Sequence, residues 1–146
     1  MRELTTEIDI KARASHVWEI LTDFEKYPSW NPFIKKIVGE PKAGTRLEAT
    51  MEPPGGKPMR FSPRVLVVRP GRELAWKGSL FISGIFDGEH HFIIEPISKS
   101  SVHFIQHERF SGVLVPFLWK MLDTKTRKGF AAMNKALKAR AEKIGR

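Results

Sequence analysis

The middle of the chain consists of short runs in which hydrophobic and polar residues alternate, and glycine, proline or serine separates each run from the next. Alternation with a period of two is typical of strands that have one buried face. The connections between runs are too short for crossover helices, so neighbouring strands should be antiparallel. The pattern predicts a first strand over residues 5–11 and a meander of six strands over residues 33–38, 46–52, 59–68, 73–80, 85–95 and 102–110.

A helical period of three to four residues replaces this alternation on either side of the meander. Residues 14–21 carry hydrophobic residues at helical spacing, with Ser15 as the expected cap, and a second short turn over residues 24–27 should end at Pro28. From residue 114 onward no strong breaker appears for about 30 residues, which predicts one continuous helix about 45 Å long. Its packed face should carry Leu118, Leu122, Gly129, Met133 and Leu137, and its outer face the basic residues Lys120, Arg127, Lys128, Lys135 and Lys138.

These elements predict an α+β fold with a single domain over residues 1–146, since the chain has no internal repeat or linker. We expect a curved antiparallel sheet of about seven strands wrapped around the long C-terminal helix, with two short helices after the first strand. A long sheet coils, and a helix laid across its concave side leaves a gap unless large side chains fill it. That gap is the predicted binding pocket.

Composition is that of an ordinary globular protein and excludes some chemistry. The 146 residues are 41% hydrophobic and 28% charged, which is not typical of disordered or membrane-spanning chains. The chain has no cysteine, so disulfides, thiolate metal sites and cysteine nucleophiles are excluded. The first residues contain no apolar signal core and no apolar run is long enough to span a bilayer, so we predict a cytoplasmic protein.

The net charge of +9 is concentrated near the end of the chain. Residues 116–146 contain nine lysines and arginines against two acidic residues, Asp123 and Glu142. This basic face is either a solvated helix surface or an interaction surface for an acidic protein, nucleic acid or anionic membrane. Aromatic residues are not interleaved with the basic ones, so we expect no nucleic acid and leave membrane contact open.

The last two strands carry the polar groups of greatest interest. If a short turn at Ser98 sets Phe92 opposite Phe104, alternate residues divide into two faces, and the more apolar face should point toward the helix. Three polar residues, His90, Gln106 and Glu108, lie on this apolar face, where each needs a partner or a ligand. They either orient the polar end of a ligand, or His90 and Glu108 act as an acid/base pair, or the three form a satisfied buried cluster.

A metal site is not expected. His91, His103 and His107 fall on the opposite face from His90, and His103 and His107 would be about 13 Å apart along one strand. We expect these three histidines to form a solvent-facing patch, and we expect no cofactor.

Gly129 lies on the packed face of the helix, where glycine is unfavourable, so it should make room for a sheet residue or for a ligand. Other large side chains are expected around the pocket as well. The predicted ligand-binding residues are Trp30, Met51, Phe61, Trp76, Phe86, His90, Phe92, Phe104, Gln106, Glu108, Phe110, Leu118, Leu122, Gly129 and Met133.

Five segments of the chain resemble the SRPBCC superfamily, which has the START-like or helix-grip fold, and within it the polyketide cyclase/dehydrase type 2 group. They are residues 14–33, which include the run ASHVWEILTDFEKYPSWNPF, and residues 70–78, 88–92, 108–112 and 129–138. The resemblance implies a hydrophobic cavity under the long helix, entered near the corner at residues 27–32. The superfamily includes lipid carriers, hormone receptors, aromatase/cyclases and co-chaperones, so the fold alone leaves the reaction open.

From these observations we expect a protein that binds or carries a lipid, an isoprenoid or an aromatic polyketide-like compound, and that is not an enzyme. One alternative is a cyclase or dehydratase that uses His90 and Glu108 as acid and base. A second alternative is an interaction module that uses the basic outer face of the C-terminal helix. The oligomeric state is left open between a monomer and a homodimer.

Overall fold

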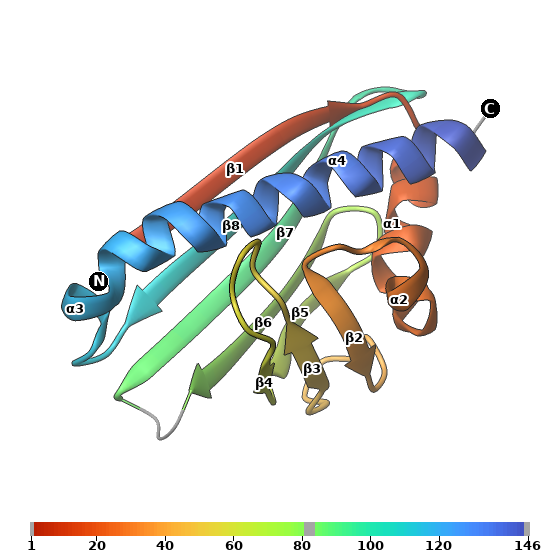
Figure 1. Cartoon of the computed structure of the whole chain (residues 1–146). Helices are drawn as coiled ribbons and strands as arrows, with labels where there is room; N and C mark the ends of the chain where they lie inside the picture. The colour runs from red at the N-terminus through yellow and green to blue at the C-terminus, as the bar shows by residue number, and fades with distance from the viewer. Residues whose placement is uncertain (1, 81–83, 145–146) are drawn as a thin grey trace.

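The C-terminal helical segment lies across the concave side of a curved sheet, and short helices cover one end (Figure 1). The structure is a computed structural model that describes residues 2–80 and 84–144. The predicted α+β architecture is confirmed, with eight strands in the described residues where about seven were expected. In chain order the elements are β1 (Arg2–Ile10), α1 (Ala14–Thr22), the 3₁₀ turn η1 (Phe24–Lys26), α2 (Tyr27–Trp30), β2 (Ile34–Val38), β3 (Glu48–Met51), β4 (Met59–Phe61), β5 (Arg64–Arg69), β6 (Glu73–Leu80), β7 (Phe86–Ser98), β8 (Ser101–Ser111), α3 (Val115–Met121), the π-helical segment η2 (Leu122–Thr126) and α4 (Arg127–Ile144).

The strands form two antiparallel sheets. Five strands pair in the order β1-β8-β7-β6-β5, and three pair in the order β2-β3-β4. The single strand expected over residues 59–68 is divided between β4 and β5, with Ser62 and Pro63 between them. Proline has no N–H to donate to a ladder, so the chain leaves the smaller sheet there and enters the larger one.

The β7–β8 hairpin has a different register from the one expected. Phe92 pairs with Gln106, and His90 pairs with Glu108, so the offset is two residues from the expected pairing of Phe92 with Phe104. The cause is a two-residue connection at residues 99–100 preceded by an irregularity between Pro96 and Ser98. Because the shift is an even number, every side chain keeps its predicted face.

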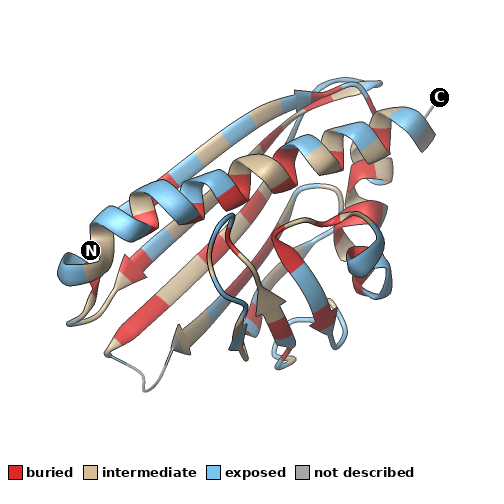
Figure 2. Cartoon of the chain, viewed as in Figure 1, coloured by how far each residue is buried: buried red, intermediate tan, exposed pale blue. Residues whose placement is uncertain are grey.

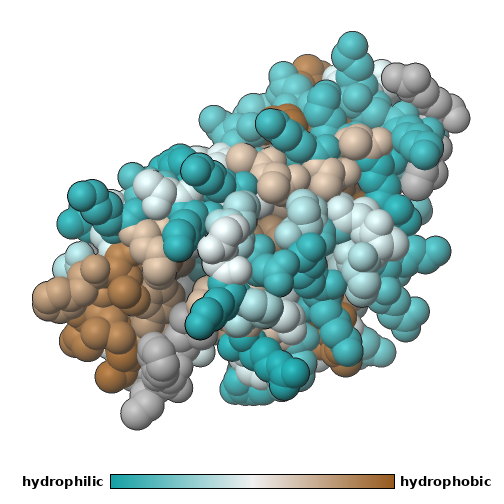
Figure 3. All heavy atoms as spheres, viewed as in Figure 1, coloured by the Kyte–Doolittle hydropathy of each residue, from teal (hydrophilic) through white to brown (hydrophobic). Residues whose placement is uncertain are grey.

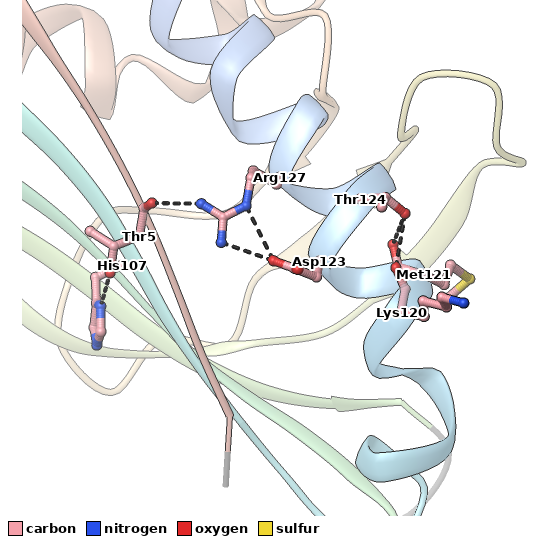
Figure 4. Close-up of polar contacts among 7 residues, drawn as sticks. All are labelled: Thr5, His107, Lys120, Met121, Asp123, Thr124 and Arg127. Atoms are coloured by element: carbon pink, nitrogen blue, oxygen red, sulfur yellow. Dashed lines mark hydrogen bonds and ion pairs between the residues drawn. The ribbon is translucent and has the colours of Figure 1, made fainter.

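The C-terminal helix is interrupted where one continuous helix was expected. Between α3 and α4 the chain makes the π-helical turn η2, in which the N–H of Arg127 reaches back five residues to the carbonyl of Leu122. The Thr124 hydroxyl donates to the carbonyl oxygens of Lys120 and Met121, at 2.9 and 3.3 Å, and so supports the widened turn (Figure 4).

Two residues expected on the outer face of the helix have side chains that form hydrogen bonds to the backbone of β1. Arg127 donates to the Asp123 carboxylate and, at 3.1 Å, to the Thr5 carbonyl, which fastens the start of α4 to β1 (Figure 4). Lys138 donates to the Asp9 carbonyl at 2.8 Å and forms an ion pair with Glu142. The outward basic face is therefore smaller than the sequence pattern indicated.

The core lies between the inner sides of the sheet and the helical segment, where buried residues recur along β7, β8 and α4 (Figure 2). The largest fully buried side chains are Trp76, Tyr27, Phe33, Phe92, Phe104 and Phe130. In the described residues, no helix combines the length and apolar character needed to cross a membrane.

The corner between α2 and β2 is held by hydrogen bonds, as expected for a rigid turn. The Asn31 Oδ1 accepts from the backbone N–H groups of Phe33 and Ile34, both at 2.9 Å. The buried Tyr27 hydroxyl donates to the Leu21 carbonyl, and burial raises the pKa of Tyr27 above its ordinary value. This corner fixes the position of Phe33, which packs against α4.

Candidate functional site

A cavity of about 330 Å³ lies between the inner face of the sheet and the α3–η2 segment. Strands β6, β7 and β8 form one wall, β3, β4 and the loop between them form another, and α3 and η2 cover it. Most of the wall is apolar. Nine of the predicted ligand-binding residues line it: Met51, Phe61, Trp76, Phe86, His90, Glu108, Phe110, Leu118 and Leu122.

The mouth of the cavity lies between the β3–β4 loop and η2. Three exposed residues mark it, namely Lys57 in the loop and Met121 and Lys125 in the helical segment. No residue of the corner at residues 27–32 lines the cavity, so the entrance expected there from the resemblance is elsewhere. None of the three was predicted: the helical phase of Met121 and Lys125 depends on the π turn, and Lys57 reaches the mouth through the position of the β3–β4 loop.

Four of the other predicted residues lie in the packed interior. Phe92, Phe104 and Met133 are fully buried in the core. Gly129 makes room for Phe33, which lies just before β2, since a Cβ at Gly129 would be 2.3 Å from Cδ1 of Phe33. None of the four lines the cavity.

Trp30 lies at a second, more polar hollow of about 170 Å³ near the C-terminal end of α4. His16, Glu19, Asp23, Lys26 and Arg140 also line this hollow. The buried indole N–H of Trp30 has no hydrogen-bond partner among the described residues, and neither does the buried Nε2 of His16. Trp30 therefore belongs to a different surface from the apolar cavity.

Gln106 lies behind His90 and fixes the orientation of its ring. The Gln106 side-chain amide donates to the Phe130 carbonyl at 3.3 Å and to Asn134 Oδ1 at 2.8 Å, and Asn134 in turn donates to the Thr6 hydroxyl at 2.9 Å. A backbone carbonyl only accepts, so the amide nitrogen of Gln106 faces α4 and its Oε1 faces His90 Nε2, 2.9 Å away. Nε2 of His90 must therefore carry a hydrogen.

The other ring nitrogen of His90 faces Glu108. Nδ1 lies 3.0 Å from Oε1 of Glu108, and the two side chains are 3% and 14% exposed. Since the hydrogen of Nε2 points to Gln106, a hydrogen bond across this contact needs a second hydrogen, on Nδ1 or on Oε1. Either a neutral imidazole accepts it from a carboxylic acid, or an imidazolium donates it to a carboxylate.

Aromatic rings and a glycine shape the surroundings of this pair. The His90 ring stacks on Phe92 with centroids 4.1 Å apart, and the Phe130 and Trp76 rings lie at 4.8 and 5.8 Å. Oε2 of Glu108 lies over Gly88, where a Cβ would be 2.2 Å from it. A glycine inside a strand is a signal of such a close approach, and it was overlooked as a site residue.

The histidines on the outer face of the sheet form ion pairs with carboxylates. His91 contacts Glu73 and Glu89, and His103 contacts Glu7 and Asp9. Burial lowers the pKa of His91, but hydrogen bonds to Glu89 and Glu73 outweigh it and raise that pKa above its ordinary value. Among the residues with described positions, no group of three or more histidine or acidic side chains is arranged to hold a metal ion.

Comparison with known proteins connects this geometry to a family. The sequence profile of the family described as "Polyketide cyclase / dehydrase and lipid transport" matches residues 1–142. No curated protein has a sequence significantly similar to this chain.

Solved structures with the same fold cover nearly the whole chain. A START superfamily protein from Mycobacterium smegmatis is 22% identical, with 97% of this chain and 98% of that one aligned and a TM-score of 0.76. The Zhui aromatase/cyclase from Streptomyces sp. R1128 is 17% identical over 99% and 96% of the two chains, with a TM-score of 0.81. A norcoclaurine synthase from Thalictrum flavum is 17% identical over 98% and 95%, with a TM-score of 0.76. At these identities the likeness shows the START-like fold.

Proposed function

The chain belongs to the polyketide cyclase/dehydrase and lipid transport family, and from this premise we propose that its cavity binds one apolar small molecule that has a single hydrogen-bonding end. Family and fold support a ligand-binding or cyclase-type role and, more broadly, hydrophobic small-molecule binding. The proposed ligand is a lipid, an isoprenoid or an aromatic polyketide-like compound. The observation that carries the proposal is the apolar cavity with one titratable pair, His90 and Glu108, on its inner wall.

The size and lining of the cavity support this ligand class. Small-molecule pockets have volumes of about 300–1,000 Å³ and apolar walls with a few polar groups that set the orientation of the ligand. The cavity, at about 330 Å³, is at the lower end of that range. It suits one small ligand, or the end of a longer one that extends through the mouth.

Glu108 supports a particular kind of polar end. Its Oε1 is occupied by His90, whereas Oε2 lies over Gly88 at the cavity wall and is available to accept a hydrogen bond. An acceptor on an apolar wall favours a ligand O–H or N–H. An ionised ligand carboxylate has no hydrogen to donate to this acceptor, so a hydroxyl, phenol or amine is favoured at this position.

Binding in the cavity is tested with the neutral fluorophore N-phenylnaphthylamine, and native mass spectrometry of protein as purified detects any retained ligand. Met51→Trp enlarges a side chain of the wall and should weaken fluorophore binding at least tenfold. Leu66→Trp makes a matched change at a residue that is 41% exposed on β5 and should leave binding unchanged. Fluorophore binding that Met51→Trp does not weaken would contradict the proposal.

The polar end is tested by moving the Glu108 carboxylate. Gly88→Ala places a methyl group where Oε2 lies. Gly78→Ala adds the same group to the paired residue of β6, which also lines the cavity but whose Cβ would meet Pro63 and Phe61 instead of Glu108. Displacement of the fluorophore by a para-alkylphenol should weaken about tenfold in Gly88→Ala only, because one hydrogen bond between the phenol and Glu108 is lost. The matching alkylbenzene should be unaffected, and an equal loss for both compounds would count against the assigned role.

A second candidate function is acid/base catalysis on the same class of ligand. The observation that favours it is the 3.0 Å contact between Nδ1 of His90 and Oε1 of Glu108 at the cavity wall. Two of the proteins with this fold, the aromatase/cyclase and the norcoclaurine synthase, are enzymes by name. Glu108→Gln should abolish turnover of a cyclisable phenolic substrate while fluorophore binding is kept, and unchanged turnover would exclude the pair as acid and base.

A further inference from the structure

An apolar patch projects from the end of the molecule that carries α3. Val113, in the turn before α3, and Phe117 and Met121, in α3, are 64%, 82% and 42% exposed. The spacing of four residues puts Phe117 and Met121 on one side of the helix. The hydropathy surface shows this patch as the large brown area at the α3 end (Figure 3). We call these three residues the apolar tip.

Cationic side chains follow the apolar tip. Lys120 and Lys125 are exposed in α3 and η2, and Lys57 is exposed across the cavity mouth. The one acidic residue between 113 and 128 is Asp123, and Arg127 holds it on the side of the helix that faces β1, away from Lys120 (Figure 4). The surface around the tip therefore keeps a positive charge next to exposed apolar groups.

The tip is continuous with the cavity. Met121 belongs to the tip and also lines the cavity, and Lys125 lines the cavity at its mouth. An apolar ligand that leaves through this mouth emerges beside the apolar side chains. Met121 and Lys125 therefore belong both to the proposed exit of the ligand and to a surface that is apolar and positively charged.

We propose that the apolar tip docks on an anionic lipid bilayer, with Phe117 and Val113 in the interfacial layer and the lysines against the headgroups. Exposed aromatic and aliphatic groups beside lysines are what interfacial membrane binding requires, since apolar burial and attraction to anionic lipids add. Docking places the cavity mouth at the bilayer surface, so a ligand passes between cavity and membrane without crossing water. This consequence rests on the proposed ligand binding, whereas the docking itself does not.

A second copy of the chain is a less suitable occupant. Stable protein interfaces use about 20 residues or more on each side around an apolar centre, and the tip offers three exposed apolar residues. Two copies facing each other through the tip would also bring Lys120 and Lys125 of each close to those of the other, with repulsion between like charges.

The test is co-sedimentation with vesicles of phosphatidylcholine alone and of an equimolar mixture with phosphatidylglycerol. The wild-type protein should bind the anionic vesicles and bind the neutral ones at least tenfold more weakly. Phe117→Ser should reduce partition into anionic vesicles at least tenfold, because its exposed ring no longer enters the interface. Ile97→Ser changes another exposed apolar residue, 59% exposed, on β7 away from the tip, and should have no effect.

The contribution of the lysines to vesicle binding is tested with the same vesicles. The double change Lys120→Gln with Lys125→Gln should reduce binding to anionic vesicles at least tenfold, whereas Lys135→Gln on α4 should have a smaller effect per charge. No binding to anionic vesicles, or an equal loss for Ile97→Ser and Phe117→Ser, would overturn the proposal. A dimer in sedimentation equilibrium that Phe117→Ser converts to a monomer would assign the tip to self-association instead.

Fluorophore binding separates this proposal from the proposed function. Phe117→Ser should keep N-phenylnaphthylamine binding in the cavity while it loses vesicle binding. Vesicle binding without any cavity binding would refute the ligand-binding role alone. Cavity binding without vesicle binding would refute the docking alone.

Discussion

Replacement of Gly129 by alanine tests how tightly α4 packs on the segment that follows the α2 corner. The substitution adds a methyl group to a helix interior, where alanine is favoured over glycine by about 1 kcal/mol. In a helix free of neighbours it would stabilise the protein. In this structure the new Cβ would lie 2.3 Å from Cδ1 and 2.5 Å from Cε1 of Phe33, where ordinary contacts begin at 3.4 Å.

The aromatic ring has little freedom to move. Phe33 is 1% exposed and packs edge-to-face on Phe130, with centroids 5.5 Å apart. Displacing it by roughly 1 Å in a close-packed core costs about 1–3 kcal/mol. The cost exceeds the helical gain, so we expect Gly129→Ala to lower the free energy of unfolding by about 1 kcal/mol net, and the Tm by about 2–4 °C.

Urea denaturation followed by far-ultraviolet circular dichroism measures the change in the free energy of unfolding. If the slope of that free energy against urea concentration is the same in both proteins, the substitution has changed stability and not the compactness of either state. Ala139→Gly at an exposed position of α4 gives the helical term alone and should cost about 1 kcal/mol. In a Phe33→Leu background the clash is relieved, so Gly129→Ala should become neutral or stabilising. A gain of about 1 kcal/mol from Gly129→Ala in the wild-type background would refute the reasoning, because it would mean that the Phe33 ring yields without cost.

Two further predictions concern stability. Because the pKa of His91 is raised in the folded state, its contribution is complete below about pH 6.5 and is lost as pH rises through the folded pKa. The stability difference between wild type and His91→Gln should thus stay below about 1 kcal/mol, because the group is partly exposed, and should shrink as pH rises above about 6.5. A difference independent of pH would exclude the ion pairs as its source. Asn31→Ala removes the acceptor of two buried N–H groups and should cost about 2–3 kcal/mol in urea denaturation, whereas a loss below about 0.5 kcal/mol would show that water replaces the amide.

Periodicity predicted the parts of this fold that depend on which face of an element is buried. The strand expected over residues 73–80 is β6, Glu73–Leu80, and the inner face of the last two strands carries His90, Gln106 and Glu108 as expected. A side-chain period of two determines the face of a residue but not its partner on the next strand. The sequence therefore placed His90 opposite Gln106, while in the structure it pairs with Glu108.

The features that periodicity missed depend on contacts between distant segments. The π turn at Leu122–Thr126 has no sequence signal as strong as a proline, and it changes the helical phase of Met121 and Lys125, which line the cavity, relative to α4. Gln106 was predicted as a ligand contact because its partner Asn134 lies 28 residues further along the chain. The predicted roles of the site residues in binding, the cytoplasmic location and the oligomeric state stay predictions.

The π turn also determines which way α3 faces. Residues 122–126 use five residues for about one turn, where a regular α-helix, which advances by about 100° per residue, would use about four. If all five residues were regular α-helix, α3 would be rotated by roughly 100° relative to α4, and Leu118 would leave the cavity wall although no cavity residue had been exchanged. Deletion of one residue here should therefore give a regular helix that keeps the cavity, whereas an insertion should rotate α3, which makes the number of residues in this turn a determinant of the binding site.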